Sequence, residues 1–258
     1  MKWITGLVSI TSLSVFVAAA VAPQTKLSPF ITFQQVPSYL YPHWKAYGDH
    51  IAKAGTERIV GTGTIVRRLT PTASLPLPVA VSLFIEFPGK VRIDEGGKAA
   101  ALFDEDVTRG GAVTEDIGDL LELLVEDFSD GFFRTLTTDG TSRWIGVNFQ
   151  SSEQPKVLYD IAELRFITKV RGTGVAQSKL YFFDSKTKLL AKVGYIEAKA
   201  RGKVAVEAEF SDWVLVKGQA LPQTLVRRED GVEMIRVQLS QLSVIAAVND
   251  GVFGGVVK

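Results

Sequence analysis

The chain has 258 residues, of which 46% are hydrophobic and 22% are charged, so it holds enough apolar side chains to form a folded core. Its 29 basic and 28 acidic residues nearly balance, and a near-neutral chain lacks the basic face that binding to nucleic acid requires. The sequence contains no cysteine, which excludes disulfides, thiolate nucleophiles and cysteine-ligated zinc.

The N-terminus has the pattern of a secretory signal peptide. Lys2 precedes a long uncharged stretch, and the small residues Ala18–Ala20 suit a cleavage site. We therefore expect residues 1–20 to be a signal peptide and residues 21–258 to form a single periplasmic domain, because an exported chain without cysteine fits a bacterial envelope. An uncleaved membrane anchor is the alternative, since the apolar stretch is nearly long enough to span a bilayer.

Two segments have the spacing of helices with one apolar face. The first covers residues 42–54, from Pro42 at its first turn to the residue before Gly55. The second covers residues 114–128, where Thr114 can cap the helix. Its apolar stripe, which needs a sheet or a ligand to cover it, consists of Ile117, Leu120, Leu121, Leu124 and Phe128.

From Thr56 onward most segments alternate apolar and polar residues, as β-strands do. Strands are expected near 58–67, 79–87, 91–93, 99–103, 143–149, 157–170, 178–184, 189–199, 203–216, 222–229 and 232–244. The turns between them are short, which is typical of an antiparallel meander. Gly61 and Gly63 indicate a bend or a close backbone approach in the first strand. The sequence predicts an α+β domain with a large curved antiparallel sheet.

Residues suited to catalysis or metal binding are sparse. The only histidines, His43 and His50, would lie two helical turns apart, roughly 10 Å, which is too far to share a metal ion and favours a structural role. No Gly-x-Ser-x-Gly motif is present, and residues 104–106 lack the alternating ligands of a calcium loop. We therefore expect no enzyme activity, no catalytic residue, no metal and no cofactor.

Apolar and aromatic residues remain as the main functional signal. They fill a core between helix and sheet, or else the concave side of the sheet exceeds what the helices fill and leaves a cavity that binds a ligand. The residues expected to line such a cavity are Leu83, Phe87, Leu120, Leu124, Phe128, Ile145, Val147, Phe182 and Phe210. A shift of one residue along a strand would invert its face.

Four groups of segments, in order along the chain, together resemble the sequence of a known family. They are His43–Gly48 with Gly61–Gly63; Phe87–Arg92; Leu180–Asp184 with Lys188–Val193; and Phe210–Trp213 with Leu221-Pro222, Arg228–Gly231 and Asn249–Phe253. Together they resemble the LolA/LolB-like carriers of bacterial lipoproteins, the outer-membrane lipoprotein-sorting protein class. The resemblance implies a half-barrel of antiparallel strands with two or three helices covering its concave side, over an apolar pocket for acyl chains. The arginine that holds the lid in this family has no clear match, although Arg58, Arg67 and Arg68 are near in order.

These observations favour a periplasmic binding or carrier protein for a lipid or a lipoprotein acyl chain. We expect it to act as a monomer, with an envelope membrane protein as a further partner. The alternative is an envelope-stress regulatory or scaffold protein that binds a protein partner with the same half-barrel. A hydrolase that depends on one histidine is the third hypothesis.

Overall fold

The computed structural model describes residues 38–48, 56–86, 90–104, 119–120, 123–124, 128, 132–133, 141–150, 156–170, 173–199, 201–247 and 252–253. The expected signal peptide, the candidate cavity residue Phe87, His50 and most of residues 114–128 lie outside these described residues. Among the described residues, no helix has the length and apolar character needed to cross a bilayer.

All eleven expected strands are present, with small differences at their ends. They are β1 (Glu57–Arg67), β2 (Val79–Glu86), β3 (Lys90–Glu95), β4 (Lys98–Asp104), β5 (Thr141–Gln150), β6 (Leu158–Val170), β7 (Thr173–Asp184), β8 (Leu190–Lys199), β9 (Gly202–Val216), β10 (Gln219–Glu229) and β11 (Val232–Ala246). The turns expected from sequence between β3 and β4, β7 and β8, β9 and β10, and β10 and β11 join these strands, and each contains a residue with positive φ.

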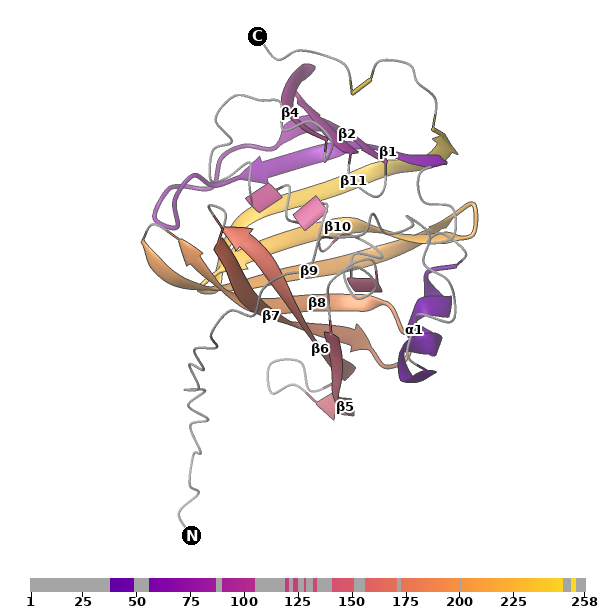
Figure 1. Cartoon of the computed structure of the whole chain (residues 1–258). Helices are drawn as coiled ribbons and strands as arrows, with labels where there is room; N and C mark the ends of the chain where they lie inside the picture. Colours follow the sequence, from indigo (N-terminus) through magenta and orange to yellow (C-terminus); the bar gives the residue numbers. More distant parts are fainter. Residues whose placement is uncertain are drawn as a thin grey trace.

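The strands form one antiparallel sheet in the order β4-β3-β2-β1-β11-β10-β9-β8-β7-β6-β5. The chain therefore makes two meanders, β1 to β4 and β5 to β11, and the pairing of β1 with β11 joins them. In Figure 1, β8 to β11 run across the view whereas β5 to β7 run steeply down it, so the sheet curls. An open, curled sheet of this kind fits the expected half-barrel.

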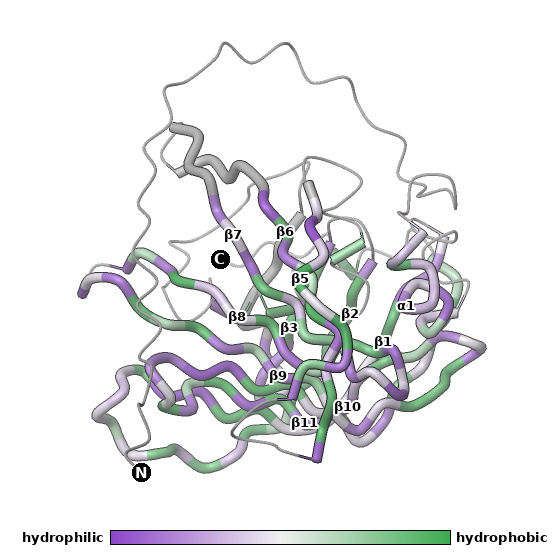
Figure 2. The backbone as a smooth tube through the Cα atoms, turned by 90° about the horizontal axis from the view of Figure 1, so that it is seen from below, coloured by the Kyte–Doolittle hydropathy of each residue, from purple (hydrophilic) through white to green (hydrophobic). Residues whose placement is uncertain are grey.

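One face of the sheet carries the core. Along β2, the residues Val81, Leu83 and Ile85 are buried, and their cross-strand neighbours on β1 and β3 are Gly63, Gly61 and Ile59 on one side and Glu95, Ile93 and Val91 on the other. Hydrophobic and hydrophilic positions likewise alternate along the tube in Figure 2. The face that includes Leu83 is called the core face below.

The helices differ from expectation. The described residues contain one short α-helix, α1 (Tyr41–Ala46), preceded by a single 3-10 turn, η2 (Ser38–Leu40), so the expected two or three helices are not matched. The first expected helix ends early because Gly48 has a φ of 81°, and a Cβ there would lie 1.9 Å from the backbone oxygen of Gly218. The Tyr47 hydroxyl also accepts a hydrogen bond from the Leu190 N–H at 2.9 Å, which fixes the turn against β8.

Gly63 marks the close approach that the sequence predicts in β1. The register between β1 and β11 shifts between Thr62 and Gly63. A Cβ at Gly63 would lie 2.0 Å from the Gln238 oxygen and 2.8 Å from the Leu239 Cα. Only a residue without a side chain fits this irregularity in the joint between the two meanders.

We expect Gly63→Ala to lower the free energy of unfolding by about 1–3 kcal/mol, because the β11 backbone must move to admit a methyl group. Urea unfolding followed by tryptophan fluorescence measures the change. Gly146→Ala is the matched control, since a Cβ at Gly146 meets nothing within 4 Å. Equal unfolding midpoints for the two variants would contradict the close approach.

Candidate functional site

The described residues between β4 and β5 lie in the core of the protein. These two strands are the opposite edges of the sheet. The described residues of this connection are all buried, at 7% exposure or less: Asp119, Leu120, Leu123, Leu124, Phe128, Phe132 and Phe133. We call these seven described residues the connecting segment. Its apolar side chains belong to the same core cluster as Leu83, so they fill the concave side.

Aromatic rings attach the end of the connecting segment to β7 and α1. The Phe132 ring lies 4.7 Å from the Tyr181 ring and 5.4 Å from the Phe183 ring, both edge to face. The Phe133 ring contacts the Tyr47 ring at 5.8 Å and the Trp44 ring at 5.7 Å. Edge-to-face pairs of this kind each add about 0.5–1.5 kcal/mol beyond the burial of their area.

A group of buried charges holds the start of the connecting segment. We call Asp119, Glu197, Lys199, Arg201, Arg227 and Glu229 the charge cluster. Lys199 Nζ donates to both oxygens of Asp119, at 2.9 and 2.7 Å, and also to Glu229. Arg227 Nη2 donates to Asp119 at 3.0 Å and to Glu197 at 2.5 Å. Asp119 thus links the connecting segment to β8 and β10 by charge-assisted hydrogen bonds.

Two further contacts extend the cluster. Arg227 Nη1 donates to the Tyr195 hydroxyl at 2.6 Å, and Arg201 pairs with Glu229. Arg227 has 0% exposure and Glu229 has 1%, so both charges have left water. A buried charge that loses its partner is far more costly than an exposed one, so the cluster is stable only as a complete set.

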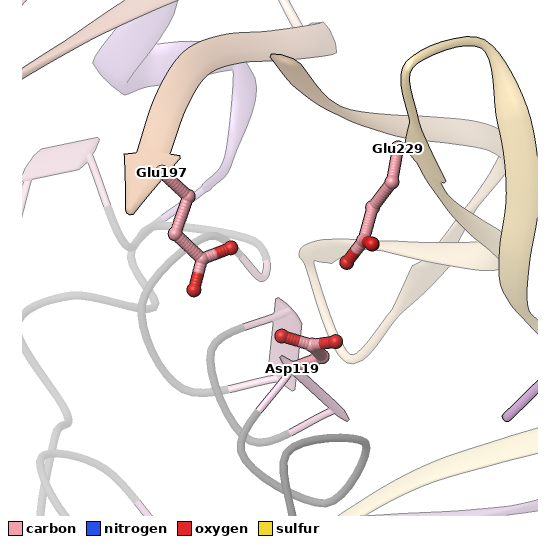
Figure 3. A group of neighbouring side chains, drawn as sticks. All are labelled: Asp119, Glu197 and Glu229. Carbon is pink, nitrogen blue, oxygen red and sulfur yellow. The ribbon is translucent and has the colours of Figure 1, made fainter. Parts of the chain in front are cut away.

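The three carboxylates of the cluster raise the question of a metal ion. Their oxygens lie within 4.8 Å of one another and converge in Figure 3. Three cations, Lys199, Arg201 and Arg227, already balance the three negative charges. Since Lys199 Nζ contacts two of the carboxylates, an internal ammonium takes the place that a metal would need. The residues fit an ion cluster better than a metal site.

Burial and hydrogen bonding oppose each other in this cluster. Burial raises the pKa of Asp119, and the charge of Arg227 with the hydrogen bond from Lys199 offsets this only in part. Burial also acts to raise the pKa of Glu229, but the hydrogen bond and charge of Lys199 lower it on balance. Of these two carboxylates, Asp119 is therefore the one that the cluster stabilises less well in its charged form.

We expect Lys199→Met to lower the free energy of unfolding by about 3–5 kcal/mol, because Asp119 and Glu229 then remain buried without this partner. Adding Asp119→Asn should recover part of the loss by removing one of the stranded charges. Lys192→Met is the control, because its partner Glu207 is 40% exposed and such a pair contributes about 1 kcal/mol or less. Chemical denaturation of the four proteins measures these differences. Similar losses in Lys199→Met and Lys192→Met would contradict the role of the cluster.

A pocket of about 340 Å³ lies at the rim of the core face. We call it the rim pocket. Its floor consists of core-face residues near the end of β1, the start of β2 and the end of β3, and the loop between β1 and β2 forms its wall. The lining residues are Ile65, Arg67, Leu69, Ala73, Ser74, Pro76, Leu77, Val79 and Glu95.

The rim pocket and the charge cluster lie at the same level of the sheet. Arg67 on β1 is opposite Ile235 on β11, which in turn is opposite Arg227 on β10. Two strand spacings separate Arg67 from Arg227, which corresponds to roughly 10 Å. One end of the concave side therefore carries both the cluster that holds the connecting segment and an open apolar pocket.

The structure brings together five of the nine candidate cavity residues. Leu83, Leu120, Leu124, Phe128 and Phe210 are members of one buried core cluster. They form part of the interior of the protein. Contact between these residues and a ligand stays a prediction. Sequence reasoning missed their neighbours Leu123, Phe132 and Phe133 in the connecting segment.

The other candidates are not in that cluster. Ile145 and Val147 on β5 are 47% and 59% exposed, whereas Trp144 packs against the core. Phe182 follows Tyr181 on β7 and faces away from it, with its ring beside Lys192 and Tyr159. Phe87 lies outside the described residues. For β5 and β7 the alternation of faces is opposite to the one expected.

The charge cluster was also missed, although the sequence carries a signal for it. Glu197 and Lys199 follow Val193 and Tyr195 at a spacing of two along β8, and Arg227 and Glu229 follow Leu225 along β10. Charged residues thus follow apolar ones on the same face near the end of each strand. Two of the arginines that the sequence suggested as lid contacts pair with strand residues instead, Arg58 with Glu86 and Arg67 with Glu95. The arginine that contacts the connecting segment is Arg227, which the sequence analysis did not name.

His43 is a buried structural residue in α1. It is 2% exposed, with Nδ1 3.1 Å from the Lys188 carbonyl oxygen and Nε2 3.4 Å from Asp160 Oδ2. Burial lowers the pKa of His43 despite these two acceptors. Asp160 in turn accepts hydrogen bonds from Lys188 Nζ at 2.6 Å and Ser185 Oγ at 2.7 Å. This group joins α1 to β6 and to the turn before β8.

Asp160 gives the stability of the protein a dependence on pH. Burial acts to raise the pKa of Asp160, but hydrogen bonds from Lys188, Ser185 and the Asn148 N–H lower it below its ordinary value of 3.8. A lowered folded-state pKa stabilises the protein above 3.8 and loses that contribution as the pH falls through the folded-state pKa.

We expect Asp160→Asn to cost about 1–3 kcal/mol at neutral pH, because charge-assisted hydrogen bonds are lost. The difference from the unchanged protein should shrink as the pH falls below 3.8. Urea unfolding at a series of pH values measures it. A difference that stays constant down to acid pH would contradict a charged, hydrogen-bonded Asp160.

Comparison with known proteins gives likeness in structure only. No family model matches the chain, and no curated protein matches it. The chain is similar to a LolA superfamily protein from Nitrosomonas europaea, at 10% identity and a TM-score of 0.49, over 83% of this chain and 96% of that one. It is similar to a structure named as an outer membrane lipoprotein-sorting protein domain from Vibrio parahaemolyticus, at 10% identity and a TM-score of 0.49, over 83% and 95% of the two chains.

A DUF1329 family protein from Desulfovibrio piger ATCC 29098 is also similar, at 10% identity and a TM-score of 0.50, over 83% of this chain and 95% of that one. One of the first two structures is thus named for the LolA superfamily and the other for lipoprotein sorting. At 10% identity such likeness concerns the fold alone, and the DUF1329 protein, at a TM-score of 0.50, supports a shared fold.

Proposed function

We propose that this protein is a periplasmic binding or carrier protein, not an enzyme, whose ligand is the acyl chain of a lipid or lipoprotein. The observation that carries the proposal is the filling of the concave side by one connecting segment, which is held at its start by Asp119. The sequence resemblance to LolA/LolB-like carriers and the curled open sheet support the same function.

Acyl chains would bind by replacing the connecting segment on the core face. Each buried Leu or Phe is stabilised by about 1.5–3 kcal/mol relative to exposure, so the six apolar side chains of the segment cannot move into water unless another apolar group takes their place. An acyl chain supplies that replacement at about 0.8 kcal/mol per buried methylene. Binding is then an exchange of apolar contacts, and its net free energy is small enough to permit release.

Asp119 sets how readily that exchange begins. Its carboxylate is shared between Lys199 and Arg227, and burial already disfavours its charge. Weakening this link lowers the cost of moving the segment and leaves the core face itself unchanged. An acyl-binding protein should therefore bind its ligand more tightly when Asp119 is neutral, because the population of the open form increases.

We expect protein purified from a bacterial periplasm to carry a lipid that solvent extraction and mass spectrometry identify. Asp119→Asn should bind a fluorescent fatty acid about three- to tenfold more tightly than the unchanged protein, which is about 1 kcal/mol. Lys192→Met, whose ion pair lies away from the connecting segment, should bind as the unchanged protein does. If neither extract nor titration gives any bound lipid, the acyl-binding role is wrong.

A protein partner is the second candidate function, and an exposed apolar row on the edge of the sheet favours it. Ile145, Val147 and Phe149 on β5 are 47%, 59% and 53% exposed, and Leu158 on β6 is 43% exposed. Because β5 is an edge strand, its backbone is available to pair with a strand of another chain. Recovery of one stoichiometric envelope protein that Val147→Lys abolishes, in a protein free of lipid, would favour this alternative.

A further inference from the structure

The connecting segment has the same order of polarity as a fatty acid. Asp119 provides a carboxylate at its start, and its other described residues, from Leu120 to Phe133, are all apolar. The carboxylate lies in the charge cluster, whereas the apolar side chains lie in the core. Under the proposed function an acyl chain takes the place of these apolar side chains. The place of the Asp119 carboxylate then needs an occupant as well.

Removal of Asp119 leaves the charge cluster unbalanced. Within the cluster three cations pair with three carboxylates. When the connecting segment moves, Asp119 moves with it, and one positive charge among the cluster residues on the sheet is in excess. Lys199 and Arg227, the two partners of Asp119, have side chains that are 3% and 0% exposed. A buried charge that loses its partner is costly, so a ligand that brings a negative charge to this place is favoured over one that does not.

The contacts of Asp119 show how the cluster holds a carboxylate. Lys199 Nζ donates to Oδ2 at 2.7 Å and to Oδ1 at 2.9 Å, and Arg227 Nη2 donates to Oδ1 at 3.0 Å. Hydrogen bonds of this charge-assisted kind are about twice as strong as those between neutral groups. Lys179 places another ammonium nearby, with Nζ 4.3 Å from the centre of the Tyr195 ring. A hydroxyl or an ester brings no charge to these donors, and a cationic headgroup would meet charges of its own sign.

The cluster also lies at a suitable place for the headgroup of a lipid. The side chain of Arg201 is 38% exposed and that of Glu197 is 24% exposed, so the cluster reaches the surface of the protein. On the same face of the sheet, the neighbours of the cluster include Val193 on β8, Ala208 on β9 and Leu225 on β10, which are buried in the core. A ligand whose carboxylate replaces that of Asp119 therefore has an apolar surface along which its hydrocarbon chain can lie.

We propose that the ligand of the core face is a free fatty acid, whose carboxylate takes the place of Asp119 between Lys199 and Arg227. This inference rests on the proposed acyl-binding function and specifies the chemical class of the ligand. Asp119 and the fatty acid are alternative partners of the same two cations. Acyl chains that end in an ester, an amide or an ammonium group lack the negative charge, and they bind less tightly.

Three ligands with the same alkyl length test this selection: decanoate, 1-decanol and decyltrimethylammonium. Titration calorimetry measures the binding of each to protein purified from a bacterial periplasm and freed of lipid, at a mildly alkaline pH that keeps decanoate ionised. We expect the dissociation constant of decanoate to be about tenfold lower than that of 1-decanol, because only decanoate forms charge-assisted hydrogen bonds. Decyltrimethylammonium should bind no more tightly than 1-decanol.

Arg201→Gln connects this preference to the charge cluster. It removes one positive charge, so the cluster without Asp119 is balanced, and the affinity ratio of decanoate to 1-decanol should fall to about two or less. Arg236→Gln is the matched control, because the Arg236 side chain is also 38% exposed and also pairs with a glutamate, Glu233. Arg236 lies between the buried residues Ile235 and Val237, so it points to the opposite face of the sheet. Its variant should keep a ratio of about ten.

Glu197→Gln should move the ratio in the opposite direction. Its amide oxygen can still accept from Arg227, but the cluster without Asp119 then has a larger positive excess. We expect the ratio to rise to about thirty or more. Glu207→Gln removes the same charge from the opposite face, where Glu207 pairs with Lys192, and should leave the ratio at about ten. Because the two cluster variants have opposite effects, general destabilisation cannot produce both.

Asp119→Asn separates the headgroup site from the anchoring of the connecting segment. It should tighten the binding of decanoate and 1-decanol by the same factor, because both ligands displace the same segment, and their ratio should stay at about ten. Equal affinities of decanoate and 1-decanol would overturn the fatty-acid assignment while acyl binding stands. A preference for decanoate that Arg201→Gln and Glu197→Gln leave unchanged would place the carboxylate elsewhere and overturn it too. If none of the three ligands binds, the acyl-binding function itself is wrong.

Discussion

The pairing of β1 with β11 is the constraint on which the rest of the architecture depends. It joins two meanders side by side, and it leaves β4 and β5 as opposite edges of the same sheet. The described residues between these two edges lie on the apolar side of the sheet. On the concave side, the core face of the sheet therefore packs against residues of the same chain that lie between its two edge strands. Gly63 belongs to this constraint, because the two strands approach too closely at that point for any side chain.

The charge cluster fixes the position of the connecting segment on the core face. Apolar contacts are not directional, so on their own they would not determine which end of the connecting segment leaves the core first. The burial of Asp119 against Lys199 and Arg227 adds a directional contact at one end of the segment, close to the rim pocket. Desolvation offsets much of the attraction within such a cluster. The segment is consequently anchored at a defined position, yet by an interaction whose net contribution is modest compared with that of the six apolar side chains.

The sequence predicts the strands well and the site only in part. Alternating apolar residues in segments such as 79–87 are enough to predict a strand. Residues that favour positive φ, such as Asp230 and Gly231, are enough to predict a turn. The faces of β5 were not predictable in this way, because its register to β6 shifts twice, between Trp144 and Gly146 and between Gly146 and Phe149. The partners of Asp119 lie about 80 and 108 residues away along the chain, and no local pattern connects them. The early end of α1 likewise depends on a contact with Gly218, far along the sequence.

The two free edges of the sheet have a consequence for the size of what it can hold. A closed barrel has a circumference fixed by its number of strands and their stagger, so its interior has one width. In this protein β4 and β5 share no ladder of hydrogen bonds, since each lies at the end of the strand order. The curvature of the sheet can therefore open or tighten through small changes in twist at every strand, without loss of any inter-strand hydrogen bond. The pairing of the strands would therefore not limit the proposed ligand of the core face to one width.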